Sequence, residues 1–284
     1  MYLSASLPNS LPNYEELLIR EDEGVLYLTI NRPEKRNAMN DAVVRGLMET
    51  FTAIENNRDI RAVVLRGADG HFCSGGDISG MGQGGSKAEA DQAAWEFNRA
   101  FGRLATQVNR APQVVIALLE GAVLGGGFGL ACISDVAIAD LNAKFGMPET
   151  GLGIIPAQIA PFVVMRIGLT QARRFALLGE RINGAAALEL GLVHYQTEGE
   201  EAMQAQLDEV LAKVRRCAPN ANAVTKQLML DVGSTDLESL LDRAADDFSQ
   251  AINSAEGKEG TTAFLEKRLP DWAAGDPAAG DPVS

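Results

Sequence analysis

The most informative segment of the 284-residue chain runs from Val114 to Asp140 and reads VVIALLEGAVLGGGFGLACISDVAIAD. Its first six residues, Val114–Leu119, are apolar and rich in β-branched side chains, which favours a buried strand. A glycine-rich turn and a short apolar helix follow, and residues 135–140 predict another strand. Strand, helix and strand in this order indicate an α/β fold with helices packed outside a sheet.

The same alternation continues toward the N-terminus. Val25–Ile30 and Ala62–Arg66 are predicted strands, and the helix between them begins at the N-cap Asn40 and carries apolar residues at helical spacing up to Ile54. Another amphipathic helix is predicted around Phe97–Val108. The N-terminal part of the chain therefore predicts an α/β core.

Composition divides the chain into three regions. Residues 14–198 are predicted to form the core, 199–272 a helical appendage without strands, and 273–284 a disordered tail. The segment 79–87 is rich in Gly and Ser and predicts a mobile loop. Its G-x-G-x-x-G match at 80–85 is assigned to that loop and not to a dinucleotide site, because no strand leads into it.

Charge and cysteine content exclude several functional classes. Thirty-eight acidic residues against 25 basic ones give a net charge of −13, which repels a nucleic-acid backbone. The three scattered cysteines suit a reducing compartment, and two distant histidines, His71 and His194, exclude a His-rich metal site. No signal peptide or membrane span is apparent, so the sequence predicts a cytoplasmic protein without metal.

Two glycine clusters follow predicted strands: FCSGGDI at Phe72–Ile78 and EGAVLGGGFGL at Glu120–Leu130. Glycine lets a ligand atom approach a backbone N–H closely, so convergent N–H groups at Gly76 and Gly126 would bind a developing oxyanion. The alternative is that the glycines only permit tight turns and close helix–sheet packing. Spacing alone leaves both interpretations open.

Glu149 is the only charged residue between Lys144 and Arg166, in an apolar segment broken by Gly and Pro. Partial desolvation of its carboxylate would raise the pKa toward a value useful for proton transfer. The alternative is a glutamate at a helix N-terminus, where the helix dipole stabilises it. The residues alone do not separate these two roles.

Other chemically notable side chains receive structural interpretations. No base pairs with Cys73 in the sequence, and neither histidine has triad or metal spacing. Trp95, Phe97 and Phe101 are interpreted as core or pocket wall.

Taken together, these segments resemble the crotonase superfamily, the enoyl-CoA hydratase/isomerase fold, from about Gly24 to Trp272. The likeness includes Asn-Arg-Pro at 31–33, Asn-Ala-Met at 37–39 and Phe-Leu-Glu-Lys-Arg at 264–268. It implies a ClpP/crotonase-like spiral of ββα units with a C-terminal helical trimerisation region. It also implies a homotrimer or a dimer of trimers that acts on acyl-CoA.

The resemblance also implies residue roles. Gly76 and Gly126 would donate their N–H groups to the thioester oxygen, and Glu149 would be one of the two family glutamates. The other family glutamate falls three residues after the second oxyanion glycine, where this chain has Gly129. Simple two-carboxylate hydration is therefore not expected, whereas hydration with one carboxylate is.

Contacts to CoA, which is part of the substrate and the only cofactor-like group expected, are implied at eight further positions. Lys35 and Arg36 would contact phosphates, Asp77 would orient the Gly76 turn, and Lys267 would reach the CoA of a neighbouring subunit. The alternative for the Lys and Arg residues is a solvated surface charge. The full set is Lys35, Arg36, Ala38, Gly75, Asp77, Ile78, Phe264 and Lys267.

Finer features resemble the branch of the family that hydrates glutaconyl-CoA thioesters. The segment 155–168 (IPAQIAPFVVMRIG) is similar to that branch, which also carries Gly in place of one glutamate. Residues 121–139, 216–222 and 255–260 are similar to isohexenylglutaconyl-CoA hydratases of acyclic terpene degradation. Hydration of 3-methylglutaconyl-CoA in leucine degradation is the alternative within this branch.

Other activities remain open at this stage. The same oxyanion site would serve an isomerase, a decarboxylase or a thioester hydrolase, because the fold alone does not select the chemistry. A non-catalytic RNA-binding homologue is disfavoured by the net charge and by the presence of Glu149.

Overall fold

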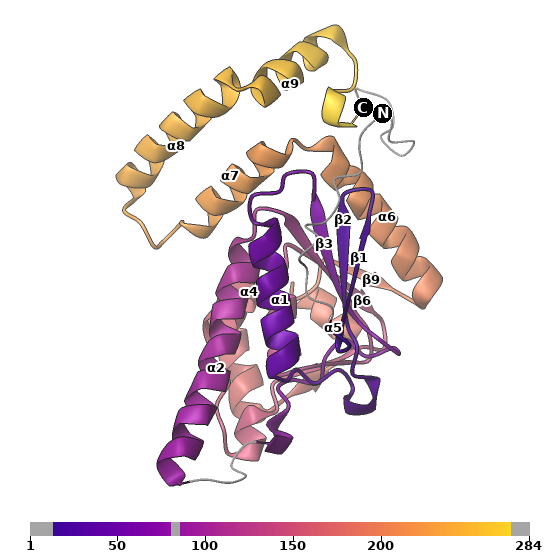
Figure 1. Ribbon diagram of the computed structural model, residues 1–284, viewed down its shortest axis with the longest axis vertical. Coiled ribbons are helices and arrows are strands. Elements are labelled where there is room, and N and C mark those ends of the chain that lie inside the picture. Colours follow the sequence, from indigo (N-terminus) through magenta and orange to yellow (C-terminus); the bar gives the residue numbers. More distant parts are fainter. Residues whose placement is uncertain (1–13, 81–85, 274–284) are drawn as a thin grey trace.

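The computed structural model describes residues 14–80 and 86–273 (Figure 1). Its main sheet has six strands in the order β1-β2-β3-β4-β6-β9, and a smaller sheet has the order β5-β7-β8. The strands are β1 (Leu17–Asp22), β2 (Val25–Ile30), β3 (Ala62–Gly67), β4 (Val114–Leu119), β5 (Ala122–Leu124), β6 (Val136–Asp140), β7 (Lys144–Gly146), β8 (Arg181–Ile182) and β9 (Tyr195–Thr197). The predicted α/β class is confirmed.

Nine α-helices and four short 3-10 helices connect these strands within the described residues. The α-helices are α1 (Asp41–Ile54), α2 (Lys87–Arg110), α3 (Gly126–Ile133), α4 (Ala160–Leu178), α5 (Gly184–Glu189), α6 (Glu200–Arg216), α7 (Pro219–Leu230), α8 (Leu237–Asn253) and α9 (Ala255–Glu266). The 3-10 helices are η1 (Pro33–Lys35), η2 (Ile78–Gly80), η3 (Glu149–Leu152) and η4 (Asp271–Ala273). No helix of the described part is both long and apolar enough to cross a membrane.

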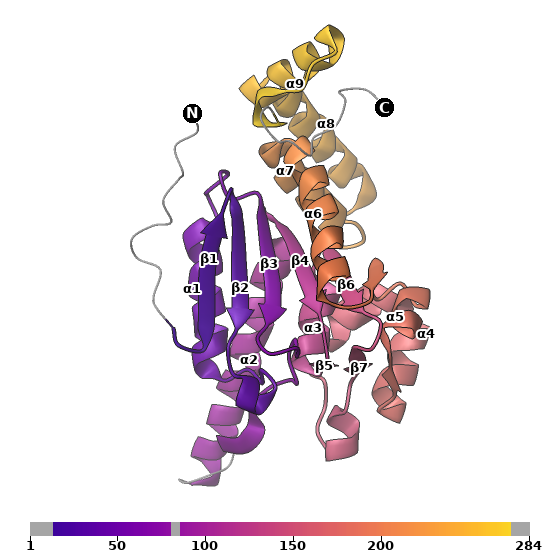
Figure 2. The same ribbon diagram turned by 90° about the vertical axis from the view of Figure 1, so that its right-hand side faces the viewer.

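The main sheet is parallel except for the antiparallel pair of β1 with β2. Residues alternate between its two faces, so Val63 and Leu65 of β3 join the larger apolar core while Ala62 and Val64 join the smaller one. The smaller core is closed by apolar residues of α6, and the larger by α1, α2 and α3 (Figure 2). Both faces are thus covered, as a mostly parallel sheet requires.

The ends of the strands position the candidate site. The carboxyl ends of β3 and β4 lie together because the two strands are parallel and in register from Ala62 opposite Val114. Each glycine cluster begins just beyond one of these ends. Segments that are about 50 residues apart in sequence therefore meet at one edge of the sheet.

The C-terminal helices α8 and α9 lie at the opposite end of the molecule from this edge (Figures 1 and 2). Helix α7 begins with Pro219 at its first position, where a missing N–H carries no penalty. Helix α9 begins at Ala255 because Ser254 caps it by accepting a hydrogen bond from the N–H of Gly257.

Both predicted ends of the loop 79–87 are wrong. Ser79 belongs to η2, and Ser86 is the N-cap of α2, where it forms a capping box with Glu89. Residues 81–85 of this loop and of the G-x-G-x-x-G match lie outside the described residues, as do residues 274–284 of the predicted tail.

Candidate active site

The first glycine cluster leaves the sheet by pairing with β5. Cys73 bridges Val123, with the Cys73 N–H donating to the Ala122 carbonyl at 2.9 Å. The Leu124 N–H in turn donates to the Cys73 carbonyl at 2.9 Å. These bonds bring the first glycine cluster beside the segment that leads into α3.

Gly76 then pairs with a different partner, Met39. The Met39 N–H donates to the Gly75 carbonyl at 2.8 Å, and the Asp77 N–H donates to the Met39 carbonyl at 2.8 Å. The carbonyl of Gly75 and the N–H of Gly76 belong to one trans peptide and point in opposite directions. The N–H of Gly76 is therefore directed away from Met39. Gly76 is exposed, so a ligand can reach this N–H.

The second cluster presents the start of helix α3. Gly126 is its first residue, and the first N–H groups of a helix have no acceptor within the helix. Gly125 precedes it with φ +51° and ψ −117°, a conformation that glycine tolerates, and donates its own N–H to the Gly146 carbonyl at 3.1 Å. This leaves the Gly126 N–H at the helix terminus, where the dipole favours negative charge.

The two clusters touch at Gly75 and Gly126. Gly75 has φ +111°, and a Cβ placed on it would lie 3.8 Å from the Gly126 nitrogen. The same Cβ would lie 3.4 Å from the Leu124 carbonyl oxygen. The backbone of Gly75 therefore passes close to the helix terminus, and the two glycine segments form one site.

Glu149 joins these glycines from η3. A Cβ on Gly125 would lie 3.1 Å from Glu149 Oε1, so the carboxylate sits beside the start of α3. Its Oε2 is buried and has no hydrogen-bond partner among the described residues. Desolvation by burial raises the pKa of the Glu149 carboxyl above its ordinary value. A half-buried carboxylate with one unpaired oxygen can exchange a proton with a ligand.

Position 129 lies on α3 in apolar surroundings. A Cβ on Gly129 would lie 2.3 Å from Ile159 Cγ2 and 3.7 Å from Phe101 Cε1. Ile159 and Phe101 are themselves buried. No side chain larger than that of glycine fits at position 129 without moving Ile159, so helix α3 offers no room for a second carboxylate at this position.

Lys35 and Arg36 lie next to the same segment. The Ser74 hydroxyl donates to the Lys35 carbonyl at 3.0 Å, and the Ser74 N–H donates to the Arg36 carbonyl at 3.0 Å. Both basic side chains are exposed. They are placed where a ligand bound at Gly76 could meet them.

Of the other predicted ligand contacts, Ala38 is buried beside Met39, and Ile78 is 49% exposed just after Asp77. Phe264 and Lys267 belong to α9 and its C-cap, at the far end of the molecule from Gly76 (Figure 2). Within one chain these two residues are not brought to the site. Their predicted contact with CoA would require a neighbouring subunit.

Three other reactive side chains serve the structure. Burial raises the pKa of the Cys73 thiol to about 12, so it is not a thiolate nucleophile. His71 Nδ1 accepts the Ala122 N–H at 3.0 Å, and His194 Nδ1 accepts the Ala137 N–H at 3.0 Å. The structural interpretation of both histidines agrees with these bonds.

Comparison with known proteins agrees with this architecture. Residues 20–275 match the family described as enoyl-CoA hydratase/isomerase. The short-chain-enoyl-CoA hydratase of Clostridium acetobutylicum is 33% identical over 88% of this chain and 95% of its own length. The 2,3-dehydroadipyl-CoA hydratase of Escherichia coli is 31% identical over 90% and 98%, respectively. The chain belongs to the enoyl-CoA hydratase/isomerase family.

Solved structures of the family superpose over nearly the whole chain. Pseudomonas aeruginosa AtuE is 57% identical, with a TM-score of 0.88 over 91% of this chain and 100% of that one. An enoyl-CoA hydratase/isomerase from Marinobacter aquaeolei is 54% identical, with a TM-score of 0.88 over 92% and 100%. The predicted crotonase fold is confirmed, and the chain is an acyl-CoA enzyme of the hydro-lyase type.

Three residues near the site, Arg32, Asn37 and Ile159, have contacts that the sequence does not predict. Arg32 and Asn37 are both buried polar residues: the Arg32 guanidinium donates to Asp77, next to Gly76, and the Asn37 amide donates to the His71 carbonyl, just before the first glycine cluster. Ile159 lies in the segment 155–168, and its contact with position 129 is not predicted by the sequence. A charged or amide side chain between a strand and a turn is the one sequence signal that could have drawn attention to Arg32 and Asn37.

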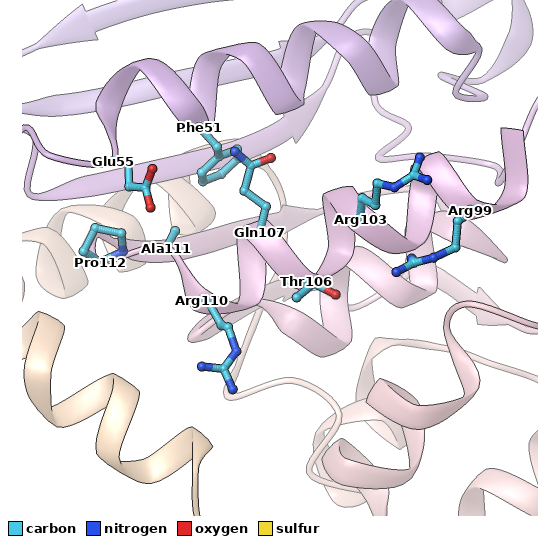
Figure 3. Close-up of a pocket in the computed structure, with 9 residues that line it drawn as sticks. All are labelled: Phe51, Glu55, Arg99, Arg103, Thr106, Gln107, Arg110, Ala111 and Pro112. Atoms are coloured by element: carbon cyan, nitrogen blue, oxygen red, sulfur yellow. The ribbon is translucent and has the colours of Figure 1, made fainter. Parts of the chain in front are cut away.

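A separate cavity of about 310 Å³ lies along α2 (Figure 3). Its lining includes Arg99, Arg103 and Arg110 of α2, Phe51 of α1 and Glu55, the C-cap of α1. None of the glycines described above lines it, and neither does Glu149. We therefore assign this cavity no part in the reaction.

Proposed function

We propose that this enzyme hydrates a 2-enoyl-CoA thioester of the glutaconyl type, with isohexenylglutaconyl-CoA of acyclic terpene (citronellol and geraniol) degradation as its substrate. The observation that supports the proposal is the contact of Gly75, the residue before Gly76, with the start of α3 at Gly126, and the position of Glu149 beside Gly125. The glutaconyl branch is supported by the segment at 155–168 and by a glycine at position 129.

The two amides would bind the thioester carbonyl. Addition of water to the double bond places negative charge on that oxygen, so donors held in advance bind it more strongly in the transition state than in the ground state. Loss of one such donor typically lowers the rate by about 10²–10³-fold. The N–H of Gly126 at the helix terminus adds the helix dipole to this effect.

Glu149 would carry both proton transfers. The ionised carboxylate takes a proton from water, the hydroxyl forms a bond to C3, and the electron pair of the double bond moves onto the thioester as an enolate. The protonated Glu149 then returns its proton to C2, so that one water molecule is added overall. Because apolar side chains surround Gly129, α3 supplies no second carboxylate for these steps. The raised pKa of Glu149 suits it to both proton transfers.

We place the adenosine and phosphate part of CoA beside Lys35 and Arg36, which are exposed next to the Gly76 segment. Phe264 and Lys267 would contribute from a neighbouring subunit. The free cysteines, two of them buried, support the cytoplasm as the site of the reaction. No cofactor besides the CoA of the substrate is proposed.

We also propose a homotrimer or a dimer of trimers. Helices α8 and α9 expose large apolar side chains, including Phe248 at 69%, Phe264 at 72% and Leu265 at 80%. Exposed apolar surface of this kind is typical of a subunit interface. Light scattering on the eluting enzyme should give three or six times the 30.2 kDa of one chain, and a monomer would contradict this proposal.

Turnover on three substrates tests the function. Crotonyl-CoA, 3-methylglutaconyl-CoA and isohexenylglutaconyl-CoA should be compared side by side, and the third is expected to give the highest kcat/KM. Hydration removes the absorbance of the conjugated thioester without releasing thiol, whereas a hydrolase releases thiol.

Preference for 3-methylglutaconyl-CoA would replace the terpene substrate by the intermediate of leucine degradation. Preference for crotonyl-CoA would remove the glutaconyl assignment. Salt-sensitive RNA binding without turnover of any acyl-CoA would overturn the enzymatic proposal altogether.

A further inference from the structure

Arg32 is a buried cation directly behind the Gly76 segment. Only 8% of the residue is exposed, and its charge is met by two carboxylates and one carbonyl. Nη2 donates to Asp77 Oδ2 at 2.8 Å, Nη1 donates to the Ala38 carbonyl at 2.5 Å, and Nε lies 3.1 Å from Glu16 Oε1. The last contact is an ion pair without an aligned hydrogen bond. Burying a guanidinium is costly, so such a set of partners calls for an explanation.

The partners of Arg32 flank the oxyanion glycine on both strands. Asp77 follows Gly76 directly, and Ala38 precedes Met39, the residue that pairs with Gly76. One guanidinium therefore ties together the two strands of the bridge that orients the Gly76 N–H. We propose that Arg32 is a positioning residue that, together with Asp77, holds the Gly76 amide against the thioester oxygen. This inference rests on the proposed function of that amide.

The guanidinium is not required for the local turn itself. Asn37 holds that turn by accepting the Arg32 N–H at 2.8 Å and by donating to the carbonyls of Ala68 and His71 at 2.8 and 2.6 Å. These bonds involve the backbone of Arg32 and leave its side chain free to act elsewhere. Two of the three side-chain contacts of Arg32, those with Ala38 and Asp77, therefore serve the Gly76 bridge, and the third pairs its charge with Glu16.

The geometry needs an arginine. A planar guanidinium presents several donors in fixed directions and can bridge Ala38 and Asp77 at once, whereas a lysine ammonium is a single point of charge. Asp77 is anchored on its other side by Ser79, whose N–H and hydroxyl both donate to Oδ1. Hydrogen bonds from Ser79 and Arg32 lower the pKa of the Asp77 carboxyl to about 2, so it remains an acceptor at neutral pH.

Substitution of Arg32 should separate catalysis from binding. A displacement of one donor by about 1 Å can lower turnover by about 100-fold, so Arg32→Met and Asp77→Asn are each expected to lower kcat by about 10–100-fold. KM should change much less, because the N–H of Gly76 binds the thioester oxygen more strongly in the transition state than in the ground state. Arg32→Lys should recover only part of the loss.

A matched control is available on the surface. Arg20 and Asp22 form an ion pair of 2.7 Å, close to the 2.8 Å of Arg32 and Asp77, but their side chains are 61% and 56% exposed. Arg20→Met removes the same chemical group from a place far from the glycines and should leave kcat unchanged.

The decisive measurement is the infrared stretching frequency of a bound thioester carbonyl. Butyryl-CoA labelled with carbon-13 at the carbonyl is saturated and is not hydrated, so this readout does not depend on which enoyl-CoA is the substrate. Hydrogen bonding lowers the frequency, and Arg32→Met should reverse part of that lowering while Arg20→Met keeps it. An unchanged frequency and unchanged kcat in Arg32→Met would overturn the proposal.

The double variant Arg32→Met/Asp77→Asn distinguishes positioning from charge neutralisation. If the pair acts as one clamp, the double variant is no more impaired than the worse single variant. Recovery of wild-type kcat in the double variant would mean that Arg32 only neutralises Asp77, which contradicts positioning. Where Arg32→Met does not fold, Arg32→Lys and Asp77→Asn carry the same test. If the wild-type enzyme hydrates no 2-enoyl-CoA substrate but still lowers the carbonyl frequency of bound butyryl-CoA, the result would instead count against the proposed function.

Discussion

The two candidate amide donors are held by different physical means. Gly126 begins a helix whose following residues, Gly127–Ile133, are all buried, so hydrogen bonds along α3 and apolar packing fix its position. Gly76 is exposed and lies in an extended segment held by one bridge to Met39 and by the ionic contacts of Arg32. A helix terminus supplies its donor through local structure, whereas an extended turn needs side chains from elsewhere. The α3 side should therefore respond to changes of volume, and the Gly76 side to changes of charge.

The largest loss of activity is expected from a substitution of Glu149, which alters neither amide donor. Glu149→Gln keeps the size of the side chain but removes the base, so hydration should fall by about 10²–10⁴-fold. The carbonyl frequency of bound butyryl-CoA should remain lowered, because both amides are intact. Glu189→Gln, on the exposed end of α5, is the matched control and should keep full activity. Wild-type turnover in Glu149→Gln would remove Glu149 from the mechanism.

The volume sensitivity of the α3 side can be tested at Gly129. Gly129→Ala places a Cβ 2.3 Å from Ile159 Cγ2, and overpacking of this kind typically costs about 1–3 kcal/mol of unfolding free energy. Ile159→Ala makes room, so the double variant should be more stable than the sum of the two single effects predicts.

Denaturant unfolding of the two single variants and the double variant measures this coupling. Gly151→Ala, where an added Cβ meets nothing within 4 Å, should change stability by less than about 0.5 kcal/mol. Additive effects at 129 and 159 would contradict the contact that keeps a second glutamate out of this site.

The candidate residues of the site can be found in the sequence more easily than the contacts that hold them together. The glycine clusters and Glu149 could be singled out as candidates because strand ends, glycines and a lone acid in an apolar segment are local features. The choice of Met39 as the partner of Gly76 could not, because it depends on how segments 37 residues apart pack. Parallel strands create such distant neighbours, and their register is not written in either segment alone.

The same reason explains what was missed at Arg32 and Ile159. Arg32 meets Asp77 across 45 residues, and Ile159 fills the space at Gly129 across 30. Nothing in the local pattern around Arg32 or Gly129 specifies these contacts. The crotonase resemblance predicted the roles of Gly76, Gly126 and Glu149, but it did not identify what holds the first of them in place.

Turnover should depend on pH through the ionisation of Glu149. Burial raises the pKa of Glu149 above its ordinary 4.5, and the base must be ionised to act. We expect kcat/KM to fall on the acid side with a midpoint above 4.5, and the residual activity of Glu149→Gln should lack this limb. A limb at or below 4.5 would mean that the carboxylate is solvated and not desolvated beside α3.

The smallest effect is expected in the acid stability of the Gly76 side. The pKa of Asp77 is lowered from 3.8 to about 2, so its stabilising contribution is fully present above the unfolded value and is lost as the pH falls through about 2. Wild type should therefore exceed Asp77→Asn in stability at pH 5, and the difference should shrink as the pH falls from 4 to 2. Thermal unfolding at several pH values measures this difference.

Arg20→Met should show a stability change below about 0.5 kcal/mol at pH 5, because exposed ion pairs contribute little. A difference between wild type and Asp77→Asn that stays constant down to pH 2 would show that Asp77 acts through its packing, and that charge does not distinguish this side of the site from α3.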